Sequence, residues 1–409
     1  MNIEITIRPY EKMDQQAWDQ YVLNHPLSNL YHLFDWGKII SKTYGHKSYY
    51  LMAVQAASQP PRFPASQLKV VGILPLVHLK HFLFGNTLVS MPFFDMGGIL
   101  ADNNEIEKAL LYETVKLCQK LKVDKLELRH TNHLSCLAHN SLPTETLQNF
   151  SSFLQSRIGY SQILLEAEKT KRSSQSCKSC QKNIQNWAFQ TRSHKVRMLL
   201  DLPDSSEKLM KSFKSKLRSQ IRKPIKEGLK PRFGGLELLN DFYDVFSTNM
   251  RDLGSPVHSK HFMKNVIEAF PDKAKIVIIY KENKPIACSL MIGFKHILEN
   301  PWASALRKYS RLSPNMLLYW AMIEYACDNG YNQFDFGRSS PDEGTHKFKK
   351  QWGAESETLH WHYISLNGHV LGEEMSEKSS FARAIQYWKK LPVSLTKIVG
   401  PYIRKYIGL

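Results

Sequence analysis

Residues 331–353 have the sequence YNQFDFGRSSPDEGTHKFKKQWG, which combines an apolar strand, a tight turn and a basic aromatic segment. The strand expected at 332–336 carries one carboxylate, Asp335, near its end, and a Gly-Arg-Ser turn follows it. Sites in α/β proteins are usually built where strands end, so the charged groups of this stretch are candidates for chemistry. The stretch therefore predicts an α/β unit with a functional turn directly after Asp335.

The residues around this stretch predict further helices and strands of the same unit. The basic segment 205–227 predicts a helix that the internal Pro224 should kink or end. Antiparallel hairpins between the helices argue against a doubly wound nucleotide-binding sheet. We expect strands at 194–202, 274–280, 285–296, 332–336 and 357–365, and further helices at 238–252, 259–270 and 315–328.

The first third of the chain predicts a similar order of elements. We expect strands at 3–8, 48–55, 69–79, 81–90 and 124–130, and helices at 14–44 and 104–122. The pair Gly85-Asn86 predicts a turn within the third hairpin strand. We interpret the repeated order as a duplicated fold, in which two tandem α/β (α+β) domains have mixed, largely antiparallel sheets.

The length of 409 residues also favours two domains, because a single hydrophobic core rarely grows that large. We place the first domain at 1–140 and the second, with the FDFGRS motif, at 195–366. The segment 141–194 is rich in Ser, Gln, Lys and Thr with little periodicity, so we interpret it as a polar insertion or linker. Residues 367–409 are interpreted as a basic amphipathic tail.

The chain carries 55 Lys and Arg residues against 37 Asp and Glu, a formal net charge of +18. This surplus favours a polyanionic partner such as tRNA, a nucleotide-linked donor or an anionic membrane surface, although solvated surface charge also accounts for it. Glu4 interrupts any signal-peptide core, and no window of about 18 uncharged apolar residues occurs. We therefore expect a cytoplasmic protein, with at most peripheral contact at the inner face of the membrane.

The six cysteines do not form a disulfide framework in a chain of this length. Cys177 and Cys180 have the spacing of half a zinc site, but the nearest partner pair, Cys136 and His139, lies about 40 residues away. We therefore expect no metal site. Three further cysteines are predicted to be core residues: Cys118, Cys288 and Cys327.

Several motifs, in order along the chain, resemble the FemAB group of the GNAT superfamily, particularly the FemAB-like proteins associated with exosortase (PEP-CTERM) and polysaccharide gene sets. The first is FDFGR with the FK and WG pairs that follow it. The others are LVSMPFFDMGGIL at 88–100, SFKSKLRSQIRKPIKEGL at 212–229, NMRDLGSPVHSKHF at 249–262 and PWASALRKYSRLSPNMLLYW at 301–320. The resemblance extends from about residue 30 to 365 and omits only the polar insertion.

This resemblance implies two GNAT-like domains around a cleft, and transfer of an acyl or aminoacyl group to an amine. The acceptor would be an amino sugar, a peptide or a lipid-linked glycan precursor of the cell envelope or of an exopolysaccharide. As catalytic residues we expect Asp335, to accept a proton or orient the amine, with Arg338 and Lys347 to hold donor phosphates or the oxyanion. The alternative is that Asp335 and Arg338 form a structural ion pair.

The donor is expected near the start of the helix at 315–328, which follows Ser313-Pro314. Residues predicted to bind it are Arg307, Arg311, Asn315, Ser339 and Lys349. The usual coenzyme A loop pattern, Q/R-x-x-G-x-G/A, does not precede this helix, which leaves acyl-CoA and aminoacyl-tRNA open as co-substrates. No permanently bound cofactor is expected. A merely capped helix with solvated arginines is the alternative.

The acceptor is expected between the domains, where loop residues of both halves contain polar groups or glycines. The predicted residues are Asp95, Gly97, Gly98, Asn249, Arg251 and Asp252, with ordinary turn and cap roles as the alternative. The basic helix and the tail also suggest a different class of function. In that interpretation the chain is a non-catalytic GNAT-like module that binds RNA or an anionic membrane surface.

Overall fold

The computed structural model describes residues 5–9, 11, 14–55, 69–134, 188–365 and 379–408. The strands of the first half are β1 (Ile5–Pro9), β2 (Lys47–Gln55), β3 (Lys69–His81), β4 (Gly85–Val89), β5 (Leu100–Ala101) and β6 (Lys125–His130). Its helices are α1 (Gln15–Asn24), α2 (Asp35–Tyr44) and α3 (Asn104–Leu121), with a 3-10 turn η2 (Leu30–His32).

The strands of the second half are β7 (Ala188–Asp201), β8 (Leu229–Gly234), β9 (Ala274–Lys281), β10 (Lys284–Phe294), β11 (Ile297–Ala305), β12 (Gln333–Ser339) and β13 (Glu355–Ser365). Its helices are α6 (Ser206–Ser212), α7 (Ser215–Lys226), α8 (Leu239–Leu253), α9 (Lys260–Ala269), α10 (Pro314–Asp328) and α11 (Gly344–Lys350), with 3-10 turns η4 (Leu236–Leu238) and η5 (Arg307–Leu312). The chain ends with α12 (Ser379–Lys390) and α13 (Val393–Arg404).

The two halves repeat one pattern of strand pairing. In the first half, β1, β2, β3 and β4 pair antiparallel in that order, and β4 then pairs parallel with β6. In the second half, β8, β9, β10 and β11 pair antiparallel, and β11 pairs parallel with β12. The mixed, largely antiparallel α/β fold and its duplication, both expected from the order of elements, are therefore confirmed.

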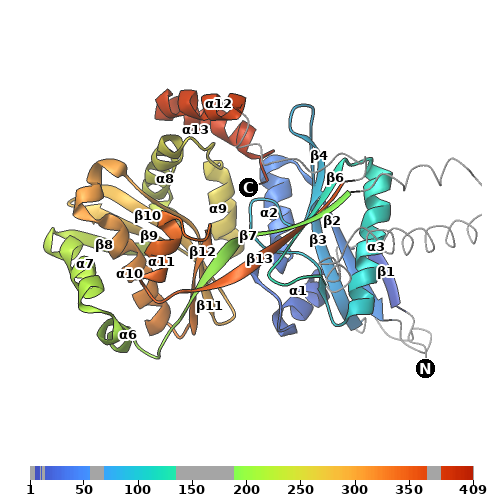
Figure 1. Ribbon diagram of the computed structural model, residues 1–409, viewed down its shortest axis with the longest axis horizontal. Helices are drawn as coiled ribbons and strands as arrows, with labels where there is room; N and C mark the ends of the chain where they lie inside the picture. The colour runs from blue at the N-terminus through green and yellow to red at the C-terminus, as the bar shows by residue number, and fades with distance from the viewer. Residues whose placement is uncertain are drawn as a thin grey trace, which may run out of the picture.

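β7 and β13 join the two halves into one continuous sheet (Figure 1). The last strand, β13, pairs antiparallel with β6 of the first half over 360–365 and with β7 along its whole length. β7 in turn pairs with β12 of the second half. In the described part of the chain, the strand order is β1-β2-β3-β4-β6-β13-β7-β12-β11-β10-β9-β8, with β5 against β3.

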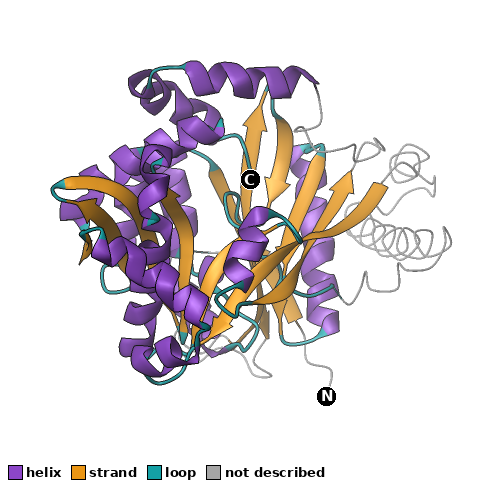
Figure 2. Ribbon diagram, turned by 60° about the vertical axis from the view of Figure 1, so that its left-hand side comes forward, coloured by secondary structure: helices purple, strands orange, loops and turns teal. Residues whose placement is uncertain are grey.

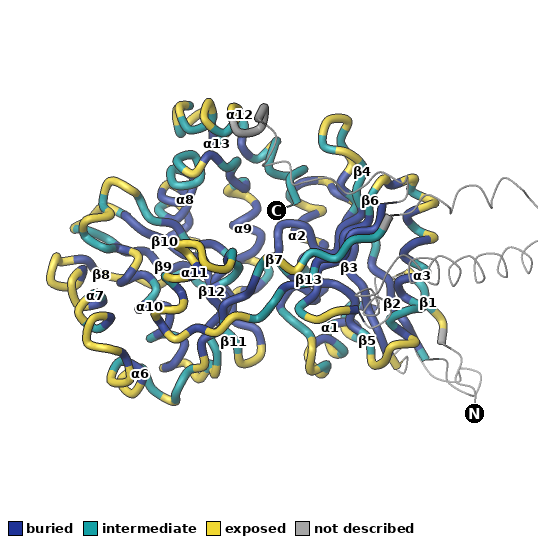
Figure 3. Tube along the Cα trace, viewed as in Figure 1, coloured by how far each residue is buried: buried dark blue, intermediate teal, exposed yellow. Residues whose placement is uncertain are grey.

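Helices pack on both faces of the sheet (Figure 2), and much of the sheet is buried (Figure 3). The buried residues of the described part of the chain form three hydrophobic clusters. The largest cluster contains side chains of α1 and α2 together with those of α8 and α9, so it spans both halves. Within it, the rings of Trp36 and Phe270 lie 5.1 Å apart and those of Tyr44 and Phe262 5.4 Å apart. The halves are thus held together by a shared core as well as by the sheet.

Local sequence signals explain where several helices begin and end. The Asn103 side chain accepts hydrogen bonds from the first backbone amides of α3, and Ser259 does the same for α9. Gly45 after α2 and Gly254 after α8 have φ angles of 74° and 83°, a left-handed conformation that glycine adopts without strain. These caps fix one end of α3 in the first half and one end each of α2, α8 and α9, which contribute to the core shared by the halves.

Some sequence predictions about the elements are wrong in detail. The basic helix divides into α6 and α7 at 213–214. As expected for a proline that ends a helix, α7 stops at Lys226, shortly after Pro224, which has no N–H to donate to the carbonyl four residues earlier. The β3–β4 turn lies at 82–84, and Gly85 and Asn86 already belong to β4. β11 was not predicted as a separate strand.

The predicted linker and tail also differ from the structure. β7 begins at Ala188, so residues 188–194 belong to a strand and not to the polar linker; residues 141–187, with Cys177 and Cys180, lie outside the described residues, as do Cys136 and His139. In the tail, where a proline could be expected to break a helix, Pro401 lies within α13. Cys118, Cys288 and Cys327 are buried, as expected. Among the described residues, no helix is both long and apolar enough to cross a bilayer.

Candidate active site

The neighbouring parallel strands β11 and β12 pair over only three residues each before they diverge. The pairs are Ile297 with Gln333, Leu298 with Phe334, and Glu299 with Asp335. Beyond this point β11 remains paired with β10, and β12 remains paired with β7. In the described residues, the facing backbone edges of β11 and β12 therefore have no strand between them after Glu299 and Asp335.

The turn after Asp335 is held in place by three hydrogen bonds. Gly337 has a φ of 74°, and the pairing of β12 with β7 shifts register between Asp335 and Arg338, which makes this position a bulge. The Gly337 amide donates to Asp335 Oδ1 at 2.7 Å. The buried Lys349 Nζ donates to the carbonyl oxygens of Gly337 at 3.0 Å and Arg338 at 2.7 Å. The turn is therefore rigid at the mouth of the gap between the strands.

A cavity of about 320 Å³ occupies this gap and extends between the two halves. The second half contributes residues from β11, β12, α8 and α10, and the first half contributes the loop after β4. The polar lining residues are Tyr31, Asp95, Arg197, His258, Glu299, Asn300, Tyr319, Asp335, Arg338 and Arg404. Ligand sites commonly occur in such cavities between domains, where polar groups converge.

Two carboxyl groups lie next to each other at the base of the cavity. Glu299 and Asp335 are directly paired in the register of β11 and β12, and both are buried. Burial, followed by the charge of Asp335, raises the pKa of Glu299 to about 7, while Arg197 opposes the shift. The Tyr31 hydroxyl donates to Glu299, but Glu299 Oε1 has no hydrogen-bond partner in the described part of the chain. Glu299 can therefore exchange a proton near neutral pH.

Two arginines hold the remaining carboxylates of the cavity. Arg197 Nε lies 2.6 Å from Asp335 Oδ2, and both side chains are buried. Arg338 Nη1 lies 3.0 Å from Asp95 Oδ1, so this ion pair connects β12 to the loop after β4. The Arg338 guanidinium also lies over the Trp361 ring, 5.3 Å from its centroid. The structural alternative predicted from sequence, an ion pair between Asp335 and Arg338, is therefore wrong.

Comparison with known proteins gives one family match, which lies in the second half of the chain. Residues 211–350 match the acetyltransferase (GNAT) domain family. The matched region, about a third of the chain, contains β11, η5, α10 and β12. No curated protein matches the sequence of the chain.

Solved structures extend the likeness beyond the GNAT match. A crystal structure of FemX is 14% identical, with 88% of this chain and 96% of that chain covered and a TM-score of 0.58. This likeness shows that the chain has the FemX fold across both halves. L-PGS from Bacillus licheniformis (10% identity, 98% of each chain, TM-score 0.47) and a tandem GNAT protein from the clavulanic acid biosynthesis pathway (10%, 88% and 98%, 0.47) also match.

The structure brings three of the predicted residues together at the cavity of the GNAT-like half: Asp335, Arg338 and Asp95. Lys349 lies beneath the turn and supports it through the two carbonyl oxygens. Burial lowers the pKa of Lys349 to about 8, although the charge of Asp335 opposes the shift. Lys347 is exposed on α11 and does not line the cavity.

The predicted donor residues lie in two places. Arg307 and Arg311 are exposed on η5, and Asn315 is exposed in the first turn of α10, beside the start of that helix. Ser339 is buried at the end of β12, and its hydroxyl has no partner among the described residues. None of the four lines the cavity between the halves.

The other predicted acceptor residues have structural contacts away from the cavity. Asn249 donates to the Ser304 hydroxyl at 3.0 Å and so connects α8 to β11. Arg251 pairs with Asp252 and donates to the Leu391 carbonyl, which fastens the tail to α8.

The two predicted acceptor glycines are positions of close packing. A Cβ atom at Gly98 would lie 2.3 Å from His130 Nε2. At Gly97, which has a φ of 113°, a Cβ atom would lie 2.8 Å from Met91. Neither glycine lines the cavity.

Sequence reasoning missed several polar residues of the cavity. Glu299 lies within the strand ILENPWASA, where a single acid in an apolar run was the available signal. Arg197 lies in β7 and Arg404 at the end of α13, and the sequence around neither residue has a pattern that indicates a site. Among the described residues, no group of three or more His, Cys, Asp and Glu side chains is placed to hold a metal ion.

Proposed function

We propose that the chain is an acyltransferase that moves an acyl or aminoacyl group to a primary amine in the cavity between β11 and β12. The observation that carries this proposal is the buried Glu299 beside Asp335 at the point where the strands diverge. An amine must lose a proton before or during acyl transfer, and a base with a pKa near the working pH does this most effectively. The GNAT match over 211–350 supports the same reaction class.

In the proposed reaction, ionised Glu299 accepts a proton from the acceptor ammonium group. The nitrogen lone pair then attacks the donor carbonyl carbon, and the bond from that carbon to the thioester sulfur or to the ribose ester oxygen breaks. The nitrogen, which carries a positive charge after the attack, gives its second proton to the leaving sulfur or oxygen, so that a neutral amide and a thiol or hydroxyl group result. The open backbone edges of β11 and β12 offer hydrogen-bonding partners to polar groups of the donor such as its carbonyl, and Arg338, which lines the cavity, would stabilise the oxyanion.

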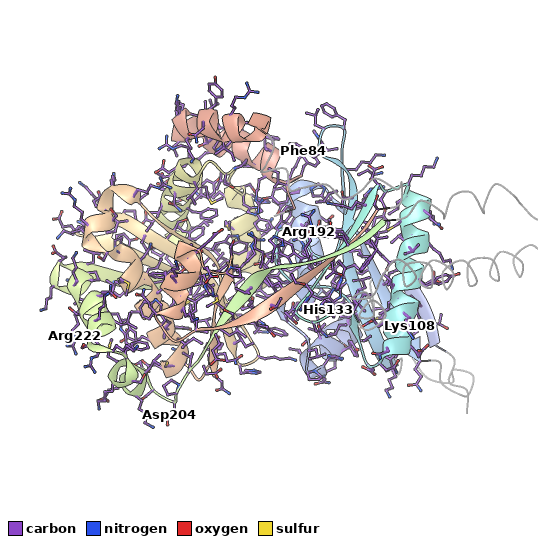
Figure 4. All side chains as sticks on the ribbon, in the orientation of Figure 1. Phe84, Lys108, His133, Arg192, Asp204 and Arg222 are labelled. Carbon is purple, nitrogen blue, oxygen red and sulfur yellow. The ribbon has the colours of Figure 1, made fainter. Side chains whose placement is uncertain are left out.

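The donor is an acyl-CoA or an aminoacyl-tRNA, and both carry phosphates. Phosphate binding at the start of α10 is supported by the exposed Arg307, Arg311 and Asn315. The outer side of α7 adds positive charge, since Arg222 is exposed there and extends away from the molecule (Figure 4). We propose no permanently bound cofactor.

The acceptor is an amine of a cell-envelope or exopolysaccharide precursor, bound from the first half near Asp95. Contact with an anionic phospholipid surface on the cytoplasmic side is supported by two segments, the β3–β4 turn and α13, which lie along the same edge of the molecule (Figure 1) and have exposed apolar side chains. Phe82 and Leu83 at the β3–β4 turn are 88% and 72% exposed, and Ile398 and Tyr402 on α13 are 65% and 69% exposed. Exposed apolar groups among basic residues favour such surfaces.

The test of acyl transfer is a turnover assay with two donor panels, acyl-CoAs and bulk aminoacyl-tRNA, each with amino-sugar and peptide amines. We expect product from one panel with the purified protein and a large loss in Glu299→Gln. The alternative, a non-catalytic module that binds RNA or a membrane, gains support if neither panel is turned over while Lys-to-Glu changes at 211–226 abolish RNA binding.

Membrane contact is tested by sedimentation with phosphatidylglycerol vesicles. We expect the wild type to sediment with them and the double variant Phe82→Asp/Leu83→Asp to remain in the supernatant. Ile225→Asp is the matched control, because Ile225 is 51% exposed on α7, far from these two segments in the fold. If all three proteins sediment equally with the vesicles, the proposal that this surface contacts the membrane is contradicted.

A further inference from the structure

Arg404, the last residue of α13, lines the cavity between the two halves. The tail that carries it is fixed on both sides. Lys397 Nζ lies 2.5 Å from Asp244 Oδ1 on α8, and the Phe93 amide of the first half donates to the Gly408 carbonyl at 2.6 Å. Arg404 is therefore held at the cavity wall by contacts to the second half and to the first.

The hydrogen bonds of Arg404 go to neutral groups. Its Nε donates to His258 Nε2 at 3.1 Å, and its Nη1 donates to the Ile407 carbonyl at 3.3 Å. Because a guanidinium can only donate, His258 carries its proton on Nδ1, which donates to the Tyr44 hydroxyl at 2.7 Å. Burial and the charge of Arg404 lower the pKa of His258, so this ring stays neutral.

Arg404 differs from the other two cavity arginines because none of the described residues gives it a carboxylate partner. Arg197 is paired with Asp335 and Arg338 with Asp95. Within the part of the chain that the structure describes, no Asp or Glu oxygen lies within ion-pair distance of Arg404. The side chain is only partly buried, so it remains accessible from the cavity.

The surroundings of Arg404 leave its charge uncompensated. Burial lowers the pKa of Arg404 to about 10; Tyr44 opposes this shift, whereas the positive charges of Arg338 and Arg129 add to it. The guanidinium nevertheless stays protonated at neutral pH. One wall of the cavity therefore carries a fixed positive charge, and the Phe93 ring, 5.7 Å away, shields it from solvent on one side.

We infer that Arg404 is the binding site for an anionic group of the substrate, a carboxylate or a phosphate. Two oxygens of such a group match the paired N–H donors of a guanidinium, and this pairing is strongest where water is partly excluded. The inference assigns a charge class to the substrate and rests on the proposed function for the role of the cavity. Anion binding itself does not require turnover, so the two proposals can fail separately.

The test measures anion binding in the full-length protein with wild type, Arg404→Gln, Arg404→Lys and Arg383→Gln. Arg383 is exposed on α12 of the same tail and serves as the matched control. Inorganic phosphate and sodium acetate are titrated separately, each against sodium chloride at equal ionic strength, by calorimetry and by the thermal unfolding midpoint. Comparison of the two anions distinguishes a phosphate-bearing from a carboxylate-bearing substrate.

We expect one of the two anions to bind the wild type and Arg383→Gln equally and to raise their unfolding midpoints above the chloride reference. Its dissociation constant should increase at least tenfold in Arg404→Gln and less in Arg404→Lys, which keeps the charge. Equal binding by Arg404→Gln, or equal responses of the wild type to chloride and to both anions, overturns the inference. If Arg404→Gln does not fold, the wild-type and Arg404→Lys comparisons decide the question.

Discussion

Glu299 and Asp335 are directly opposite each other in the last paired register of β11 and β12, so two carboxyl groups enter one buried position with Arg197 on the far side of Asp335. Only one of them has a counter-ion at hydrogen-bonding distance. Asp335 has Arg197 and the Gly337 amide, whereas Glu299 has the Tyr31 hydroxyl. This difference in partners agrees with the raised pKa of Glu299, because no counter-ion at hydrogen-bonding distance stabilises its charged form.

The first prediction concerns the pH dependence of activity. With Glu299 as the base, kcat/KM should rise as pH increases through about 7, because only the ionised form accepts a proton. Glu299→Gln should lower kcat by roughly 10²- to 10⁴-fold and remove this dependence. Glu324→Gln, a half-buried acid on α10 away from the cavity, should keep the wild-type profile. If the pH dependence of kcat/KM in Glu299→Gln is the same as in wild type, another residue is the general base.

The second prediction concerns stability and the same carboxyl group. The folded pKa of Glu299, about 7, is above its ordinary value of 4.5, so its stabilising effect is complete below pH 4.5 and is lost as pH rises through 7. At about 1.36 kcal/mol per pKa unit, the shift from 4.5 to about 7 corresponds to a loss of no more than roughly 3–4 kcal/mol. Thermal unfolding should therefore show that Glu299→Gln gains stability relative to wild type as the pH is raised from 5 to 8. If the difference in stability between the two proteins does not change with pH, the raised pKa of Glu299 is contradicted.

The third prediction concerns the ion pair between Arg197 and Asp335. Arg197→Met leaves a buried carboxylate without its partner and should destabilise the fold by roughly 3–5 kcal/mol in urea unfolding. Adding Asp335→Asn removes that charge, so the double variant should be more stable than Arg197→Met alone. If the loss of stability in the double variant equals the sum of the losses in Arg197→Met and Asp335→Asn, the two residues are not coupled.

The fourth prediction contrasts two lysines of α11. Lys349→Ala removes the donors to the carbonyl oxygens of Gly337 and Arg338, and should cost roughly 1–3 kcal/mol and reduce turnover by loosening the turn. Lys347→Ala changes an exposed side chain and should alter stability by less than about 0.5 kcal/mol. Thermal unfolding and kcat of both variants check this. Loss of turnover only in Lys347→Ala would restore the catalytic role predicted from sequence.

The fifth prediction concerns Gly98, which sequence reasoning assigned to the acceptor. A Cβ atom at this position would overlap the His130 ring, so Gly98→Ala should destabilise the protein by about 1–3 kcal/mol through overpacking. The loss should be the same with and without substrate. A variant of wild-type stability whose KM for the acceptor alone rises would support the acceptor role instead.

Much of the fold could be predicted because the apolar periodicity of its elements is strong. α3, α8, α9 and α10 lie within about one residue of the predicted limits, and the repeated order of elements indicated the duplication. β11 was missed because its sequence, ILENPWASA, contains a proline, which is unusual within a strand. The pairing of β10 with β11 also contains a bulge, which the alternation of apolar and polar residues does not reveal. The pairing of β13 with β6 could not be predicted, since local sequence does not encode which distant edge a strand meets.

The candidate site was predicted only where residues lie next to each other along the chain. Asp335 and Arg338 were found because the FDFGRS turn is a local pattern. Their partners, Arg197 and Asp95, lie more than a hundred residues away, and Arg404 reaches the cavity only because the tail folds back. The exposed position of Lys347 and the buried position of Lys349 depend on how α11 rotates against β12, which a short Lys-rich segment does not specify.

The position of β13 between β6 and β7 also constrains how this chain is made. During synthesis β6 emerges from the ribosome early, but its outer neighbour is not translated until residue 365 has been added. Until then the nascent first half has an unpaired strand edge, which is where chains associate wrongly with one another. We therefore expect this protein to be most prone to aggregation while it is being translated. Expression of residues 1–140 alone should give aggregates.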